Sequence, residues 1–432
     1  MPKPDTTQLV NTTLHDRILG TLVGSAVGDA VGLYTEFLTA KRAEAEYPGR
    51  RFSLSPPTPF ARDMHRLKHQ LGDWTDDTDH ALLILLSFLH GSLTPDDVAA
   101  RLRVWVNQGL RALDSLPLGL GATVGAIVHD PAYLDNPVAA ALKVWRKGNC
   151  NVAPNGSVMR THPLGVVGLF TEEVEAMDNA ARLSAITHVD PRCVVSCMIV
   201  TALVRGLIRG EVTTEAHIDG VIDRAVERYN CAPGPFQDAL AVDVDEMSLG
   251  RGELRKYTHA TSLATLDLDV EGIGYVYKAL GSALLLLRQA MRRVAEARSS
   301  LAAKAVLFEP LITDLVMAGG DADTNACVAG ALLGAYVGYT ALPAHWRDGL
   351  RHGTWLTGKG EAVCRVLGVV EGGYEREEDT AVDGGREMVS ADNQERRWME
   401  LQARMAAENT AYLQKQKEKE AVKALKTRWL RW

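Results

Sequence analysis

The sequence has few cysteines, and their spacing excludes two common kinds of small stabilised fold. Cysteine occurs at positions 150, 193, 197, 231, 327 and 364. This spacing matches neither a zinc ribbon nor a dense disulfide framework, so we expect a reduced intracellular compartment. The N-terminus also lacks an apolar segment after a basic start, and no secretory signal is visible. A protein of the cytoplasm, or of the nucleus, is therefore expected.

Long apolar runs and alternating strand patterns are also scarce. Residues 193–204 are too short to span a bilayer, and residues 326–342 consist mainly of Ala, Gly and Leu, so both are interpreted as buried helices. The best strand candidate is residues 263–270. The formal net charge of −7 argues against a general nucleic-acid surface. We expect an all-α protein that is monomeric and binds neither nucleic acid nor membrane.

Helical periodicity dominates the rest of the chain. Four segments have the spacing of helices buried on most sides: residues 79–89, 191–208, 273–294 and 324–339. The composition changes near Gly372, where the chain becomes polar and charged. A charged helix is expected over about residues 393–432, lying on the main domain or partly in solvent rather than in a coiled coil. The prediction is a compact multi-helix domain over residues 1–371, followed by a charged linker and C-terminal helical extension over residues 372–432.

Glycines recur at four-residue steps in two helical segments. The two sets are Gly20, Gly24, Gly28 and Gly32, and Gly330, Gly334 and Gly338. Such steps lie along one face of a helix, and each glycine costs roughly 1 kcal/mol of helix stability relative to alanine. The usual reason for accepting that loss is close approach of another backbone. We therefore predict that the two glycine faces pack together, which would carry Asp29 and Glu36 toward Asp321 and Asp323.

Two short segments combine carboxylates and threonines just before apolar helices. They are GDWTDDTD at residues 72–79 and GGDADTN at residues 319–325. Helix capping explains part of each set, because Thr and Asp are good N-caps and acidic residues suit the positive end of the helix dipole. Capping needs only one or two oxygens per segment, whereas gathered carboxylates repel one another unless a cation lies between them. Since oxygen ligands favour Mg²⁺, Mn²⁺ or Ca²⁺, the paired segments predict a site for a hard divalent cation.

Two further segments carry polar groups with a possible role. Asp29 lies in a small, apolar helical segment, where an unpaired carboxylate is costly, so it is expected to bond a neighbouring helix end or to orient the site. Glu36 follows Gly32, the expected helix end, and can project from a loop into a cleft, although alone it fits an ordinary surface glutamate better. Residues 155–160, NGSVMR, contain small residues that can expose backbone N–H groups to phosphate oxygens. A plain loop before a helix is the alternative.

Together, these segments resemble the ADP-ribosylglycohydrolase family in order and spacing. The matching stretches are GDAVGLYTEF at residues 28–37, DWTDDTDHAL at 73–82, NGSVMR at 155–160 and GGDADTNACVAGALLGAYVG at 319–338. Weaker agreement appears at residues 187–188, 273–276 and 342–346. The resemblance spans about residues 14–370, and the WTDDT and DADTN pair is highly specific.

That resemblance implies an all-α hydrolase with two Mg²⁺ ions, or Mn²⁺, in a central cleft. The enzyme would cleave the glycosidic bond between ADP-ribose and an acceptor, on a protein or a small molecule, with water activated by the metal pair. The implied metal ligands are Thr75, Asp76, Asp77, Asp321, Asp323 and Thr324. Glu36 matches a catalytic glutamate, and Asp77 or Asp321 is the alternative, metal-bound base. The implied substrate contacts are Asp29, Asn155, Gly156, Ser157, Met159, His188 and Tyr275, although a buried core histidine fits His188 nearly as well.

One departure from the family pattern bears on specificity. Many members carry Asp-x-Gly-x-Thr-Thr where this chain has GLGATV at residues 119–124, so that Gly119 replaces the aspartate and Val124 the second threonine. Because that aspartate assists catalysis in members that act on ADP-ribosylarginine, the linkage cleaved here is left open. A non-catalytic ADP-ribose reader is the first alternative. The intact acidic set argues against it, whereas Gly119 argues mildly for it. A crystallin-like structural member is the second, and a metal hydrolase of another nucleotide or phosphoester is the third.

Overall fold

The computed structural model describes residues 6–231 and 251–429, which form helices and loops with three isolated β-bridges and no strand. The expected all-α class is confirmed. The helices are α1 (Thr6–Gly32), α2 (Ala40–Glu46), α3 (Asp76–His90), α4 (Pro95–Gln108), α5 (Ala122–Val128), α6 (Pro137–Lys147), α7 (His162–Val167), α8 (Glu173–Ala185), α9 (Pro191–Arg209), α10 (Glu215–Cys231), α12 (Arg251–Thr258), α13 (Val276–Glu296), α14 (Ser300–Lys304), α15 (Phe308–Val316), α16 (Ala322–Val337), α17 (Ala344–Arg347), α18 (Gly353–Val366) and α19 (Ala391–Trp429).

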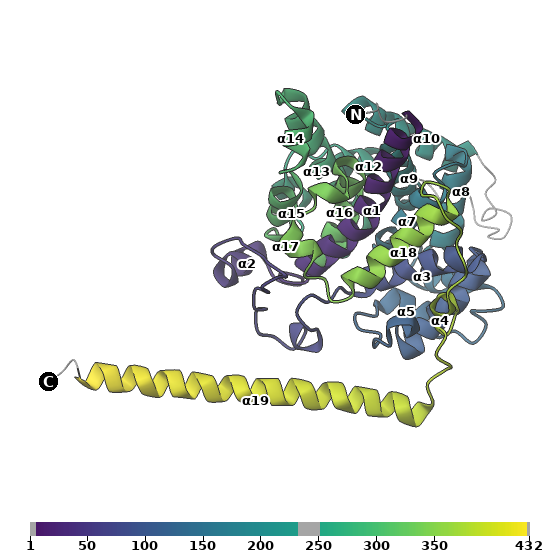
Figure 1. Cartoon of the computed structure of the whole chain (residues 1–432). Helices are drawn as coiled ribbons and strands as arrows, with labels where there is room; N and C mark the ends of the chain where they lie inside the picture. Colours follow the sequence, from purple (N-terminus) through teal and green to yellow (C-terminus); the bar gives the residue numbers. More distant parts are fainter. Residues whose placement is uncertain (1–5, 232–250, 430–432) are drawn as a thin grey trace.

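Two helices from opposite ends of the chain, α1 and α16, pack face to face in the centre of the molecule (Figure 1). Their glycine faces meet, as predicted. A Cβ atom at Gly334 would lie 1.9 Å from the Gly20 carbonyl oxygen, and one at Gly28 would lie 2.0 Å from the Ala326 carbonyl oxygen. Because no side chain larger than hydrogen fits at these positions, the two backbones touch directly.

The remaining core helices surround this pair. α13, α15 and α9 pack on α16, and α18 packs on α1. In the described part of the chain, α9 is the one helix long and apolar enough to cross a membrane, but 94% of its apolar window is buried inside the protein. Residues 193–204 therefore belong to a buried core helix, as predicted.

The strand prediction for residues 263–270 is wrong. Residues Leu263–Leu266 form a short 3₁₀ helix, η4, in which the Ser262 carbonyl oxygen accepts hydrogen bonds from the Thr265 N–H (3.1 Å) and hydroxyl (2.7 Å). Leu266 and Leu268 are buried. The alternating leucines thus fill the core from a turn, and no neighbouring strand pairs with them in the described residues.

The polar segment after α18 is packed against the main body. Lys359, a buried residue of α18, forms ion pairs with Glu377 and Asp379. α19 then runs along the lower edge of the molecule and extends past it (Figure 1). Leu401 is its one buried residue among the side chains that the structure describes. A helix lying partly on the domain and partly in solvent matches the prediction, and residues 430–432 of the predicted helix lie outside the described residues.

Candidate metal and substrate site

Glu36 is fixed beside the start of α16 by a pair of backbone hydrogen bonds. The Phe37 N–H donates to the Gly320 carbonyl oxygen (2.7 Å), and the Gly320 N–H donates to the Leu38 carbonyl oxygen (2.8 Å). This exchange ties the turn that follows α1 to the residue that precedes Asp321. The geometry brings Glu36 and Asp321 together, as the glycine pattern predicted.

Three carboxylates gather at this point. One oxygen from each of Glu36, Asp321 and Asp323 lies within 4.8 Å of the other two, which is close enough to share a cation. Glu36 and Asp323 are only 5% and 3% exposed. The first acidic segment reaches the same place, because the charge of Asp77, at the start of α3, acts on Asp323 and that of Asp321 acts on Asp77. The two segments therefore meet, as predicted.

The electrostatics of this cluster are unfavourable without a counter-charge. Burial, followed by the charges of Asp29 and Asp321, raises the pKa of Asp77 well above its usual value. Burial and the charges of Glu36 and Asp77 do the same to the pKa of Asp323. Since adjacent buried carboxylates disfavour each other's ionised form, the group is suited to binding positive charge.

The donor atoms fit a hard divalent cation. The Oδ1 atoms of Asp77 and Asp323 are buried and have no hydrogen-bond partner in the described part of the chain. Such enclosed acceptors normally carry a large free-energy penalty. The surrounding donors are carboxylate and hydroxyl oxygens, which is the ligand chemistry that Mg²⁺ and Mn²⁺ prefer.

Capping explains only part of the first acidic segment. The Thr75 hydroxyl caps α3 by accepting from the Asp77 N–H at 3.5 Å. Asp79 accepts hydrogen bonds from the indole N–H groups of Trp74 and Trp105, both at 2.9 Å. These contacts explain why Thr75 and Asp79 are polar. They do not explain Asp77, whose Oδ1 atom has no hydrogen-bond partner in the described part of the chain.

Asp29 holds the start of α3 and is enclosed. Its carboxylate accepts hydrogen bonds from the backbone N–H groups of Thr75 (3.0 Å) and Thr78 (3.0 Å) and from their hydroxyls (2.8 and 2.5 Å). Burial raises the pKa of Asp29 to about 6, against the opposing effect of these bonds. The expected bond to a neighbouring helix end is present. Asp29 is fully buried and both its oxygens are occupied, so it positions α3. Its contact with substrate stays a prediction.

The loop at residues 155–157 borders the carboxylates. The Asn155 Nδ2 atom donates to Asp321 Oδ2 at 2.8 Å. The Ser157 hydroxyl is buried and accepts from the Ser184 hydroxyl at 3.1 Å, so the side chain is directed into the core. The backbone N–H groups of Gly156 and Ser157, in contrast, donate to no acceptor in the described part of the chain. The loop therefore has free donors of the kind that hold phosphate oxygens.

His188 lies directly against this loop. A Cβ atom at Gly156 would be 3.1 Å from the His188 ring, so glycine allows the contact. The ring Nδ1 is hydrogen-bonded with the Thr187 hydroxyl (2.7 Å), and the buried Nε2 has no partner among the described residues. Burial lowers the pKa of His188 to about 3, so the ring is neutral at pH 7. Its contact with substrate stays a prediction.

Met159 and Tyr275 flank the same loop. Met159 is 3% exposed, and its N–H donates to the Asn155 carbonyl oxygen (3.2 Å). Tyr275 is half-buried, pairs with Pro154 in an isolated bridge and donates its hydroxyl to Glu253 (2.9 Å). This bridge also explains why α13 begins at Val276 rather than at the predicted residue 273. Substrate contact by either side chain remains a prediction.

Gly119 lies against the carboxylate of Asp76. Its φ is +90°, and a Cβ atom there would be 2.1 Å from Asp76 Oδ1. Residues other than glycine rarely adopt a backbone conformation with this positive φ. The position at which this chain departs from the family pattern therefore lies against Asp76, one of the predicted metal ligands.

Sequence reasoning missed two residues that hold Glu36. The Arg66 guanidinium is buried and donates to the backbone carbonyl oxygens of Tyr34 (2.9 Å) and Glu36. The His65 Nε2 donates to Glu36 Oε2 at 2.6 Å. Their one signal in the sequence is the basic run HRLKH at residues 65–69, which has no periodicity and no motif.

Comparisons with known proteins give a consistent result. Residues 10–376 match the family model described as ADP-ribosylglycohydrolase. A putative ADP-ribosyl glycohydrolase, L543, of Acanthamoeba polyphaga mimivirus is 26% identical over 351 residues, covering 78% of this chain and 92% of that protein. The ADP-ribosylarginine hydrolase Tri1 of Serratia proteamaculans (strain 568) is 23% identical over 340 residues, covering 78% of this chain and 75% of that protein.

A solved structure has the same fold. It is described as an ADP-ribosylglycohydrolase-related protein complex and superposes with a TM-score of 0.53 at 23% sequence identity. The match covers 82% of this chain and 99% of that one. At this identity, the comparison concerns the arrangement of helices.

Proposed function

The chain belongs to the ADP-ribosylglycohydrolase family, and from that premise we propose that it is a metal-dependent hydrolase of the bond between ADP-ribose and an acceptor. The observation that carries the proposal is the meeting of Glu36, Asp77 and Asp323, which are buried, with Asp321, which is half-buried; Asp77 and Asp323 have unpartnered oxygens. A cluster of this kind is costly to fold and has no capping role for those oxygens. Bound Mg²⁺ or Mn²⁺ would offset this cost and would take part in the hydrolysis.

The metal ligands that we propose come from the two acidic segments. They are Thr75, Asp76, Asp77, Asp321, Asp323 and Thr324. When bound, the cations would orient the ribose hydroxyls and lower the pKa of a water molecule. Asp29 contributes by fixing the N-terminus of α3, which carries the first half of this set.

Glu36 is our candidate for the general base. Cleavage at the anomeric carbon passes through a transition state with oxocarbenium character, and the attacking water must lose a proton. The carboxylate of Glu36 is nearly buried, and the next two residues, Phe37 and Leu38, are hydrogen-bonded to Gly320. Glu36 can therefore accept that proton without first being ordered. The Asp77 or Asp321 carboxylate is the alternative acceptor.

The remote half of the substrate would bind the loop at residues 155–157. The free N–H groups of Gly156 and Ser157 suit the diphosphate, and Asn155 joins this loop to Asp321. Binding energy from the diphosphate would then orient the distal ribose at the carboxylates. His188, Met159 and Tyr275 are the other proposed contacts.

A substrate panel tests the proposal. Peptides ADP-ribosylated on serine or on arginine, and O-acetyl-ADP-ribose, are incubated with the enzyme in Mg²⁺ or in EDTA, and free ADP-ribose is measured by liquid chromatography. We expect release from at least one substrate, reduced by about a hundredfold or more in EDTA because a metal supplies several kcal/mol of transition-state stabilisation. Release that is equally fast in EDTA would contradict metal dependence. Tight binding without release would support the ADP-ribose reader, the alternative that Gly119 favours.

A Gly119→Ala substitution is expected to weaken metal binding by roughly tenfold to a hundredfold, as loss of ligand orientation does in other metal sites. The new Cβ would collide with Asp76 Oδ1 and would force a side chain into a positive φ. Mn²⁺ affinity can be measured by electron paramagnetic resonance. Gly121→Ala is the matched control, since no atom lies within 4 Å of its Cβ and its φ is −63°. Equal Mn²⁺ affinity in both variants would contradict the proposal that Asp76 is a metal ligand.

A further inference from the structure

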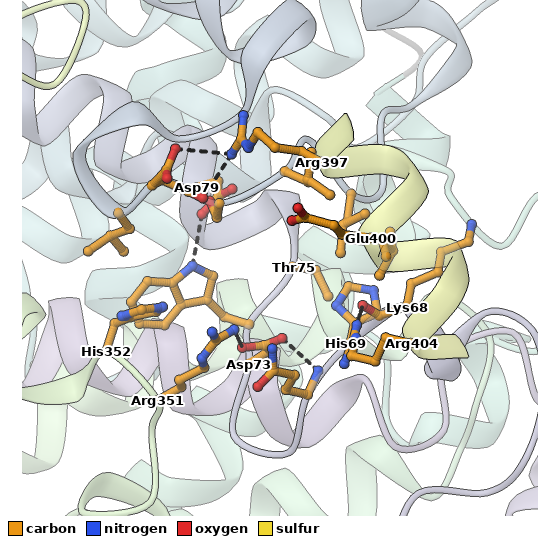
Figure 2. A pocket seen from close by; sticks show the side chains of 18 residues that line it. Lys68, His69, Asp73, Thr75, Asp79, Arg351, His352, Arg397, Glu400 and Arg404 are labelled. Carbon is orange, nitrogen blue, oxygen red and sulfur yellow. Dashed lines mark hydrogen bonds and ion pairs between the residues drawn. The ribbon is translucent and has the colours of Figure 1, made fainter. Parts of the chain in front are cut away.

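α19 begins after the last residue that the family model matches, residue 376, so it is an addition to the family's core. It nevertheless contacts two segments of the main body, and one of them, residues 62–68, is hydrogen-bonded to Glu36. Figure 2 shows Arg397, Glu400 and Arg404 of this helix lining a pocket together with Lys68, His69 and Thr75, and the pocket has a volume of about 390 Å³. An added helix in this position is able to influence the site.

The first contact anchors α19 to the main body. The Arg397 guanidinium donates to the backbone carbonyl oxygens of Gln108 (3.0 Å) and Asp114 (2.8 Å). Both residues come shortly before Gly119 in the chain, and Gly119 lies against Asp76. This end of the helix is thus held to a fixed part of the structure.

The second contact holds residues 61–70, which we name the His65 loop. Arg404 donates to the backbone carbonyl oxygen of Lys68 at 2.6 Å. From the opposite direction, Arg62 donates to the backbone carbonyl oxygen of Glu408 (3.2 Å) and lies over the Tyr412 ring, 4.1 Å from its centroid. The bonds run both ways between helix and loop, so the loop is clamped along its length.

The His65 loop transmits this restraint to Glu36. The His65 Nε2 donates to one carboxylate oxygen of Glu36 at 2.6 Å, and the His65 ring packs on Phe37 with 4.8 Å between centroids. Arg66, two positions before Lys68, bonds the backbone of Tyr34 and Glu36. A continuous chain of contacts therefore runs from α19 through the loop to the carboxylate.

We propose that α19 is a positioning element for Glu36: it clamps the His65 loop, and His65 then holds the carboxylate in the orientation that accepts the proton. The proposal rests on the proposed role of Glu36 as general base. His65 and Arg404 are positioning residues in this scheme, because neither touches the reacting atoms. The physical reason is that a polar contact made by a surface loop is weak unless the loop itself is ordered.

Two pairs of variants of the full-length protein test the chain of contacts. Arg404→Ala removes the clamp's contact at Lys68 and leaves that of Arg62, and Gln402→Ala, an exposed position on the same helix, is its control. His65→Ala removes the contact to Glu36, and His65→Gln keeps an N–H donor near the place of Nε2. Arg404→Lys keeps a cationic donor and guards against a general loss of structure. Each variant is assayed for kcat and KM on the best substrate of the panel, for Mn²⁺ affinity, and by hydrogen–deuterium exchange of residues 33–38 and 61–70.

For Arg404→Ala we expect faster exchange in both segments and a fall in kcat of about tenfold, with KM and Mn²⁺ affinity unchanged, because misplacing a catalytic group by about 1 Å can lower the rate up to a hundredfold. His65→Ala should lower kcat by about as much or more, and His65→Gln and Arg404→Lys should recover part of the loss. Gln402→Ala should match the parent.

Unchanged exchange in the His65 loop of Arg404→Ala, or faster exchange with unchanged kcat, would overturn the proposal. A change confined to KM or to Mn²⁺ affinity would also overturn it, since it would assign the loop to binding. Absence of turnover in the parent enzyme would be a failure of the proposed function instead. In that case the exchange of residues 33–38 in Arg404→Ala still decides whether α19 orders the Glu36 turn.

Discussion

An Asp323→Asn variant will unfold at a higher temperature than the parent in metal-free buffer, and it will no longer be stabilised by Mg²⁺. Asp323 is nearly fully buried, its Oδ1 has no partner in the described chain, and burial with the charges of Glu36 and Asp77 raises its pKa well above the usual 3.8. In the unfolded chain the carboxyl ionises freely, so folding at neutral pH must either bind a proton or bury a charge. This penalty is absent below about pH 4 and grows as the pH rises from the unfolded pKa toward the folded one. Asn has the same shape and carries no such penalty.

The same substitution should lower turnover by on the order of a thousandfold, since several kcal/mol of transition-state stabilisation are lost with the cation. Differential scanning fluorimetry with and without Mg²⁺, at pH 4.5 and pH 7.5, gives the stability. Asp348→Asn, at an exposed aspartate, is the control and should change neither quantity. If Asp323 were only a helix cap, its replacement would lower stability in metal-free buffer and leave the response to Mg²⁺ intact, and that result would contradict a cation site.

A Gly28→Ala variant will lose about 3 kcal/mol of unfolding free energy or will fail to fold, because the added methyl group has no space. Its Cβ would lie 2.0 Å from the Ala326 carbonyl oxygen, and backbone on both sides cannot move aside as a flexible side chain can. Overpacking of a core commonly costs about 1–3 kcal/mol, and rigid backbone places this site at the upper end. Urea unfolding followed by circular dichroism measures the effect.

Gly358→Ala is the matched control for this substitution. Gly358 is an exposed position within α18, and no atom lies within 4 Å of where its Cβ would be. In an exposed helix interior the change to alanine should raise stability by up to about 1 kcal/mol. If Gly28→Ala instead unfolds within about 0.5 kcal/mol of the parent, α1 and α16 are not in backbone contact, and the route by which Glu36 reaches Asp323 must be different.

Much of the site was predictable from the sequence, because its parts have a regular spacing. Glycines at four-residue steps identified the touching faces of α1 and α16. Once those faces are joined, the turn after α1 must reach the start of α16, and Glu36 must approach Asp321 and Asp323. The excess of carboxylates over what capping needs pointed to a cation, and the unpartnered oxygens of Asp77 and Asp323 agree with that reasoning.

The parts that were missed depend on contacts without periodicity. Arg66 and Arg404 act through bonds to backbone carbonyl oxygens, and a carbonyl is present at every residue, so no partner can be read from the sequence. The strand error at residues 263–270 has a related cause. Alternating leucines satisfy the pattern of a half-buried strand, but a strand also needs a neighbour, and here the η4 turn buries Leu266 and Leu268 without one.

The pairing of α1 with α16 has a consequence for how the molecule is made. Ser25 on α1 and Cys327 on α16 are in contact at 3.1 Å although 302 residues separate them in the chain. During synthesis, the face of α1 that packs on α16 therefore has no partner until most of the other core helices have emerged from the ribosome. Closing so long a loop is entropically unfavourable, and pairings of this kind form slowly. The carboxylates of Glu36 and Asp323 come together through this pairing, so a chain in which α1 and α16 have not yet paired lacks the acidic cluster.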